Sequence, residues 1–212
     1  MLNQSGATGA PGPKDLAGPD FVVLVVCGAN LCRSPLAEHL LRSRVADLGL
    51  SWAVSSAGVE AEPGRPMHPY AERLLRNRGV DVTGWLSHRV HPESVARADL
   101  VVTATQRQRD QVASLRPAAM SRVFGLFQLA RWAEAARTAD PVNPADFGAW
   151  LAESARSVRS HTQPSRSDRR DLADPNGHSY RQFVRCADLV DLAWKSILGA
   201  APLTGAVARP SN

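Results

Sequence analysis

Two patterns of apolar residues alternate along the chain, and each predicts one kind of element. The unbroken apolar run Phe21–Val26 predicts a strand that is buried on both faces, as strands of parallel sheets are. Beyond a short polar loop, a helix is predicted because apolar residues repeat at helical spacing: Ala37, Leu40, Leu41, Val45 and Leu48. We expect Ser34 to cap this helix, Pro35 to fit its first turn and Gly49 to follow its end.

The same alternation continues to the end of the chain. Further strands are predicted at Trp52–Ser56, Asp99–Thr103 and Arg122–Phe124. Further helices are predicted at Pro69–Arg78, His91–Ala96, Gln106–Leu115, Gly125–Ala136 and, with one apolar face, Tyr180–Ile197. Strands that alternate with helices indicate an α/β fold with a parallel sheet and helices on both faces. Ligands of such sheets bind beyond the carboxyl ends of the strands, which is where Cys27 follows the first apolar run.

Local composition suggests the domain limits. Residues 1–20 are rich in Gly, Pro and Ala without apolar periodicity, so we expect a disordered N-terminal arm. Residues 21–199 are expected to form a single domain. Within it, the polar, proline-containing stretch 138–170 is interpreted as an insertion that is partly helical around Ala145–Val158. Residues 200–212 are expected to be a flexible tail.

The overall composition, 44% hydrophobic and 21% charged residues, is typical of a globular protein. No apolar run is long enough to cross a bilayer, and the N-terminus lacks the basic start and apolar middle of a signal peptide. We therefore expect a cytoplasmic protein without membrane contact. The three cysteines, Cys27, Cys32 and Cys186, are an odd number and do not suggest a disulfide scaffold.

The net charge of +5 comes almost wholly from arginine, which suits two-bond contacts with phosphate or carboxylate. A positive surface can attract an anionic substrate or a nucleic acid. No nucleic-acid partner is predicted, because no nucleic-acid motif or interleaving of basic and aromatic residues accompanies the charge. The arginines Arg166, Arg169 and Arg170 can recruit an acidic partner or form a solvated loop, and the solvated loop is the favoured interpretation.

The candidate chemistry lies between the first strand and the first helix. A thiol attacks phosphorus only as a thiolate, and Cys27 would face the amino end of the helix that starts near Ser34, where free N–H groups favour an anion. Arg33 can close this loop around a phosphate with a forked contact. Ser34 can donate to the thiolate, and Asn30 can connect the backbone of the loop. The residues predicted to bind the phosphate group are Gly28, Ala29, Asn30, Leu31, Cys32 and Ser34.

The stretch Val26–Glu38 (VCGANLCRSPLAE) resembles the phosphate loop of low molecular weight protein tyrosine phosphatases. Further segments resemble other parts of that family in the same order: Ser55–Gly58, Ser87–Arg89, Ala98–Val102 and Asp174-Pro175. The resemblance implies a three-layer α/β fold with a four-stranded parallel sheet and a phosphate-binding loop after the first strand.

The resemblance also implies a two-step reaction. Cys27 attacks phosphorus and forms a phosphocysteine, Arg33 binds the phosphate oxygens, and Asp174 first protonates the leaving oxygen and then activates water. No metal or other cofactor is implied, and the scattered histidines offer no metal set. Asp140-Pro141 is a rival for Asp174, and Asp171 is a lesser one. Asp174 is preferred because a helix with an apolar face follows it.

Leu31 bears on the substrate, and the chain departs from the family at Ala29 and in two segments. Leu31 favours phosphotyrosine over phosphoarginine, because the arginine phosphatases that the chain resembles carry threonine there. Ala29 replaces the usual glycine and requires a negative φ. The segments Val59–Glu62 and Asn176–His178 lack the aromatic side chains that flank phosphotyrosine in the family, and the residues that could substitute are Tyr180, Trp85 and His178.

The sequence thus predicts a protein-tyrosine-phosphatase that acts on a phosphorylated protein, with a tyrosine kinase as one candidate. The alternatives are a phosphatase of phosphoarginine or another ester, or a phosphate-loop binding module without turnover. An arsenate reductase is disfavoured because no cysteine pair lies between Cys32 and Cys186. By the resemblance, Cys32 can form a reversible disulfide with Cys27, or it is a small packing residue. His88 either joins a network behind the loop or is structural.

Overall fold

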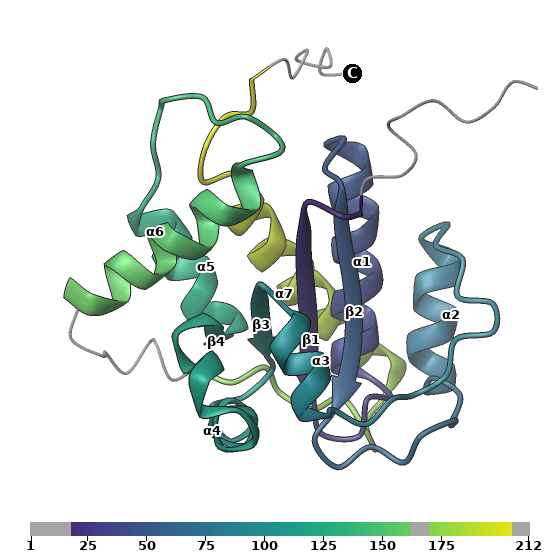
Figure 1. Cartoon of the computed structure of the whole chain (residues 1–212). Helices are drawn as coiled ribbons and strands as arrows, with labels where there is room; N and C mark the ends of the chain where they lie inside the picture. The colour runs from purple at the N-terminus through teal and green to yellow at the C-terminus, as the bar shows by residue number, and fades with distance from the viewer. Residues whose placement is uncertain (1–17, 162–169, 205–212) are drawn as a thin grey trace, which may run out of the picture.

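The computed structural model describes residues 18–161 and 170–204 and contains a four-stranded parallel sheet in the order β2-β1-β3-β4 (Figure 1). The strands are β1 (Phe21–Cys27), β2 (Trp52–Gly58), β3 (Leu100–Thr103) and β4 (Val123–Gly125). The predicted α/β fold and all four predicted strands are confirmed. Most of the predicted disordered arm, residues 1–17, lies outside the described residues.

Helices cover both faces of the sheet. They are α1 (Arg33–Asp47), α2 (Pro69–Asn77), α3 (Pro92–Arg97), α4 (Gln106–Leu115), a 3-10 turn η1 (Pro117–Arg122), α5 (Leu126–Ala135), α6 (Phe147–His161) and α7 (Tyr180–Leu198). Of these helices, which belong to the described part of the chain, none is long and apolar enough to cross a membrane.

The side chains of β1 alternate between two hydrophobic cores, because successive side chains of a strand point to opposite faces. Val23 and Val25 enter a large core that includes side chains of α1, α5, α6 and α7. Leu24 and Val26 enter a smaller core with side chains of α3, α4 and η1. The uninterrupted apolar run of β1 is therefore explained by burial on both faces, as the sequence predicted.

Helix α7 closes the larger core and fixes the C-terminal segment to the first helix. Its Trp194 and Phe183 side chains are fully buried, and Trp194 Nε1 donates a hydrogen bond to Ala37 O at 3.0 Å. Because α7 follows directly on residues 171–178, this packing positions the segment that contains Asp174.

The stretch predicted as a polar insertion contributes more to the core than its composition suggests. Helix α6 buries Phe147, Leu151 and Ala155, spaced four residues apart, and Phe147 stacks on Trp52 with ring centroids 6.0 Å apart. The end of the stretch, residues 162–169, lies outside the described residues, and so do Arg166 and Arg169.

The C-terminal segment differs from the predicted flexible tail at its start. Ala200 and Ala201 are buried, and Val142 exchanges backbone hydrogen bonds with Pro202 and Thr204 at 2.8 and 2.9 Å. These contacts join residues 200–204 to the segment that precedes α6. The rest of the predicted tail, residues 205–212, lies outside the described residues.

Candidate active site

Strand β1 ends at Cys27 and helix α1 begins at Arg33, so residues 28–32 form a short loop at the carboxyl edge of the sheet. The carbonyl oxygens of this loop bind neighbouring backbone: Cys27 O accepts from Val59 N and Gly28 O from Glu60 N, both at 3.0 Å. Within the described residues, no acceptor pairs with the backbone N–H groups of residues 29–33. These N–H groups and the amino end of α1 therefore remain available for an anion.

The end of β2 is shaped to receive this loop. A Cβ atom on Gly58 would lie 2.3 Å from Gly28 O and 2.8 Å from Asn30 N, which leaves no room for any side chain. Gly58 is also the partner of Cys27 in the β1–β2 register. The resemblance of Ser55–Gly58 to the family's second strand thus has a steric basis in the close approach of the two backbones.

Asn30 is the residue that holds the loop in shape. It is fully buried, and among the described residues it is the one non-glycine residue with a positive φ, 56°. Its Nδ2 donates to Ser34 Oγ and Ser56 Oγ at 2.8 Å each, and its Oδ1 accepts from His88 N at 2.8 Å. Asparagine tolerates the left-handed region better than most residues, and three hydrogen bonds stabilise it there.

A buried carboxylate sets the direction of these hydrogen bonds. Glu38 is 3% exposed, and its Oε2 accepts from Ser56 Oγ at 2.5 Å and from Trp85 Nε1 at 3.3 Å. Because Ser56 donates to Glu38, it accepts from Asn30, and the second Asn30 proton goes to Ser34. The Ser34 hydroxyl is then left to donate to Cys27 Sγ at 3.0 Å or to the Ala57 carbonyl at 3.3 Å.

The predicted cap at Ser34 is wrong, while its predicted contact with the thiol is present. Helix α1 begins one residue earlier, at Arg33, and its N-cap residue Cys32 makes no side-chain capping bond. The Ser34 hydroxyl is turned toward Cys27 and Asn30 instead. Pro35 lies in the first turn, as predicted.

The roles of Glu38 and Ser56 were not predicted from the sequence. A usable signal was the spacing of Ser34 and Glu38, four residues apart and therefore on one face of α1. A carboxylate on the face that also carries a residue of the phosphate loop indicates a polar network behind that loop. The His88 ring is exposed, and its residue contributes to this network through its backbone N–H.

Arg33 and Asp174 are in direct contact. Arg33 is 8% exposed, and its Nη2 donates to Asp174 Oδ2 at 2.5 Å while its Nη1 donates to the Leu172 carbonyl at 3.2 Å. Asp174 Oδ1 accepts from Asn176 N at 3.1 Å. The Asp174 side chain is 49% exposed, so the carboxyl lies at the mouth of the site, above a nearly buried guanidinium.

The two rival carboxylates lie elsewhere. Asp171 Oδ1 accepts from the backbone N–H of Gln106 at 2.8 Å, at the start of α4. Asp140 lies between α5 and α6, where its backbone N–H donates to Thr138 Oγ1 at 3.0 Å. Neither lines the cavity around Cys27, which Asp174 does line.

The cavity is small, with a volume of about 40 Å³. It is lined by Cys27, Ala29, Leu31, Cys32, Arg33, Asp174 and Asn176. Of the other residues predicted to bind phosphate, Asn30 and Ser34 lie behind this lining, and Gly28 carries backbone contacts to the β2 side. Ala29 is exposed and has no positive φ, so its side chain fits the loop.

The thiols of Cys32 and Cys186 have raised pKa values. Burial, with smaller effects from the charges of Asp174 and Cys27, raises the pKa of Cys32 to about 12. Burial likewise raises the pKa of Cys186 to about 12. Both therefore stay protonated at neutral pH. All three cysteines are free thiols here, and a redox pair of Cys27 with Cys32 stays a prediction.

Among the described residues that line the small cavity, none carries an aromatic ring. Tyr180 packs edge-on against Tyr70, with centroids 5.6 Å apart, and under the Arg73 guanidinium. Trp85 contacts Glu38 behind the loop, and His178 lines a different cleft, beyond Asp174. None of the three residues considered as substitutes takes the place of the family's aromatic side chains.

The described residues contain no group of three His, Cys, Asp or Glu side chains placed to hold a metal ion.

Comparison with known proteins gives one family. Residues 22–149 match the family model described as low molecular weight phosphotyrosine protein phosphatase. A probable low molecular weight protein-tyrosine-phosphatase, EpsP of Ralstonia nicotianae, is 34% identical over 107 residues, which cover 50% of this chain and 71% of that protein.

Two relatives carry other names. A protein-arginine-phosphatase of Bacillus subtilis is 34% identical over 104 residues, covering 49% of this chain and 69% of that protein. An arsenate reductase of Bacillus licheniformis is 33% identical over 81 residues, covering 38% of this chain and 54% of that protein.

Among solved structures, a low molecular weight protein tyrosine phosphatase from T. tengcongensis superimposes with a TM-score of 0.63. The match covers 84% of this chain and 97% of that one at 21% identity. At this identity the likeness shows the fold alone.

Proposed function

Because the chain belongs to the low molecular weight phosphotyrosine protein phosphatase family, we propose that it hydrolyses phosphate monoesters through a phosphocysteine formed on Cys27. One observation carries the proposal: the Cys27 thiol, the Arg33 guanidinium and the Asp174 carboxyl all line one cavity of about 40 Å³. A cavity of this size accommodates a phosphoryl group and leaves the rest of the substrate outside.

Substrate binding begins with an exchange of partners at Arg33. A phosphate dianion competes with the Asp174 carboxylate for the guanidinium, which can bind two phosphate oxygens in a fork. The free N–H groups of the loop and the amino end of α1 bind the remaining charge. The same donors stabilise the charge that spreads over the phosphoryl oxygens in the transition state.

The first chemical step forms the bond between the thiolate sulfur of Cys27 and phosphorus as the bond from phosphorus to the leaving oxygen breaks. Protonated Asp174 gives its proton to that oxygen. In the second step a water molecule attacks phosphorus, Asp174 takes a proton from the water, and the sulfur–phosphorus bond breaks. The Ser34 hydroxyl, 3.0 Å from Cys27 Sγ, stabilises the thiolate that departs. Apart from the substrate and this water molecule, every group named in these steps comes from this chain.

Protein phosphotyrosine is the proposed substrate, and a tyrosine kinase is one candidate protein. Leu31 supports this choice, because it lines the cavity and presents an apolar side chain to a phenyl ring. A second candidate is phosphoarginine or another non-aromatic phosphate. The observation that favours it is the lack of an aromatic ring among the described residues that line the cavity.

A substrate panel tests the proposal. Purified protein is assayed with a chelator on p-nitrophenyl phosphate and on matched phosphotyrosine, phosphoserine and phosphoarginine peptides, with Cys27→Ser as control. We expect phosphotyrosine to give the highest kcat/KM and Cys27→Ser to be inactive on all substrates. Faster turnover of phosphoarginine would favour the second candidate. Tight vanadate binding without hydrolysis of any substrate would indicate a binding module and refute the phosphatase.

A further inference from the structure

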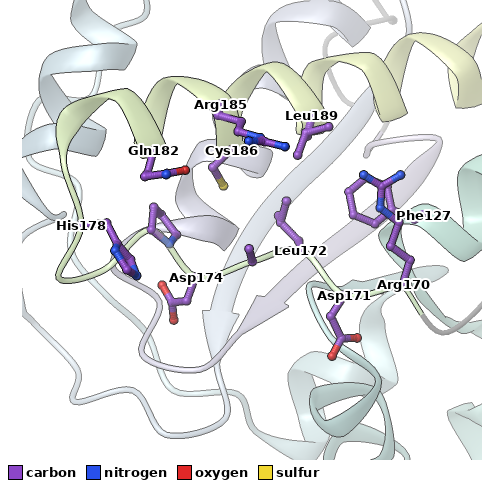
Figure 2. Close-up of a pocket in the computed structure, with 12 residues that line it drawn as sticks. Phe127, Arg170, Asp171, Leu172, Asp174, His178, Gln182, Arg185, Cys186 and Leu189 are labelled. Atoms are coloured by element: carbon purple, nitrogen blue, oxygen red, sulfur yellow. The ribbon is translucent and has the colours of Figure 1, made fainter.

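A second, larger cleft adjoins the phosphate cavity. It has a volume of about 380 Å³ and lies between α7, α5 and residues 170–175 (Figure 2). Asp174 lines both the small cavity and this cleft. A peptide whose phosphate group occupies the small cavity therefore has the cleft as its neighbouring surface on the far side of Asp174.

The cleft carries two arginines that have no acidic partner among the described residues. Arg170 and Arg185 line it and are exposed, and within residues 18–161 and 170–204 neither forms an ion pair with a carboxylate. The two carboxylates that also line the cleft are already engaged. Asp171 accepts from the Gln106 backbone N–H, and Asp174 pairs with Arg33. Because Asp174 is paired with Arg33, the charges of two arginines face the single charge of Asp171, and the net charge of the cleft is positive.

The surroundings of these arginines suit a peptide side chain. Figure 2 shows Leu172 and Leu189 in the cleft together with both arginines, so apolar surface lies beside the charges. The Arg170 guanidinium stacks over the Phe127 ring, 4.8 Å from its centroid, and Arg185 extends from the rigid helix α7. The contact with the Phe127 ring restricts Arg170, and attachment to α7 restricts Arg185. Each arginine therefore loses less conformational freedom when it binds a ligand.

We propose that this cleft is a substrate subsite in which Arg170 and Arg185 bind a carboxylate side chain close to the phosphotyrosine. Arginine binds carboxylates with two parallel hydrogen bonds, and the apolar residues of the cleft take the methylene groups of the same side chain. The preferred substrate is thus an acidic phosphotyrosine segment. This inference rests on the proposed phosphatase function and adds to it the chemistry of the residues around the phosphate.

The test compares two phosphotyrosine peptides that differ in charge alone. One carries Glu on both sides of the phosphotyrosine, and the other carries Gln at those positions. We expect wild-type protein at low salt to prefer the Glu peptide by about tenfold in kcat/KM, since each part-exposed arginine–carboxylate pair contributes about a factor of three. The Arg170→Gln/Arg185→Gln variant should reduce this ratio to about two or less, and added salt should reduce it in the wild type.

Two controls distinguish a failure of the proposed subsite from a failure of the proposed phosphatase function. Arg181→Gln removes an exposed arginine of α7 that does not line the cleft, and it should keep the wild-type ratio. Hydrolysis of p-nitrophenyl phosphate shows that each variant is folded and active, and its absence in the wild type would refute the phosphatase itself. A wild-type enzyme that hydrolyses both peptides at equal kcat/KM overturns the subsite alone. So does a preference that survives in the double variant.

Discussion

The two sides of the candidate site are built differently. On the side of the phosphate loop, Asn30, Ser34 and Glu38 are almost completely buried, and each has at least two hydrogen-bond partners. On the other side, Asp174 is half exposed and is held by Arg33 and by its own turn. The phosphate group thus meets a fixed surface, while the leaving group meets an adjustable one. In the proposed reaction, attack on phosphorus depends on the first side, and protonation of the leaving group and the choice of substrate depend on the second.

Removal of the nucleophile should have the largest effect, because it abolishes the function of the fixed side. Cys27→Ser is expected to lower kcat for p-nitrophenyl phosphate by roughly 10⁴-fold or more, since a serine hydroxyl is not ionised at neutral pH. Vanadate should still bind, because the loop N–H groups and Arg33 are intact. Substantial residual turnover would show that Cys27 is not the nucleophile.

The next largest effect is expected on the adjustable side. Asp174→Asn removes the proposed acid and should lower kcat by about 10² to 10³-fold on phosphotyrosine peptides. The loss should be smaller with p-nitrophenyl phosphate, whose leaving group needs no proton. The matched variant Asp140→Asn changes the same residue type away from the cavity and should behave as wild type. Equal losses in both variants would exclude Asp174 as the acid.

Two variants at Asn30 measure how much this residue contributes to the free energy of unfolding. Asn30→Gly keeps a residue that tolerates a φ of 56° but removes three hydrogen bonds, so the free energy of unfolding should fall by about 3 kcal/mol. Asn30→Ala should cost about 1 kcal/mol more, because alanine is strained at that φ. Urea unfolding measures both values. Identical stability of the two variants would contradict the strain argument.

The last test is chemical labelling, which changes no residue and compares the reactivity of the three thiols. At pH 7 iodoacetamide should modify Cys27 and leave Cys32 and Cys186 unmodified. Burial raises the pKa of the latter two to about 12, so at a pH far below this value they remain protonated and unreactive. Peptide mass spectrometry identifies the labelled residue, and vanadate should slow the reaction. Labelling of Cys32 at the rate of Cys27 would contradict this assignment.

The placement of Cys27 and Arg33 on one loop could be predicted from the sequence because its determinants are local. The apolar run of β1, the loop after it and the start of α1 are contiguous, so this placement follows from residues 21–48. The fold class follows from the alternation of strands and helices along the whole chain. The role of Ser34 as a cap was wrong because a hydroxyl at a helix start can serve either the backbone or a neighbouring side chain. Tertiary contacts with Asn30 and Cys27 decided between them.

The parts of the site and the fold that were not predicted depend on contacts between residues that are distant in sequence. Glu38 and Ser56 meet across α1 and β2, and Arg33 meets Asp174 after a separation of 141 residues. A helix around Ala145–Val158 was predicted within the polar stretch, and α6 lies there. Its burial was not predicted, because three buried residues at a spacing of four are a weak signal within a charged stretch. The cleft with Arg170 and Arg185 exists only where α5 and α7 pack together.

The contact between Arg33 and Asp174 has a consequence for the order of events at the site. Arg33 Nη2 is bound to Asp174 Oδ2, so one guanidinium holds the carboxyl that the proposed reaction needs at the leaving oxygen. A phosphate group that takes over Arg33 releases this oxygen, while Asn176 N still holds Asp174 Oδ1. Substrate binding thus also frees the carboxyl that serves the leaving group.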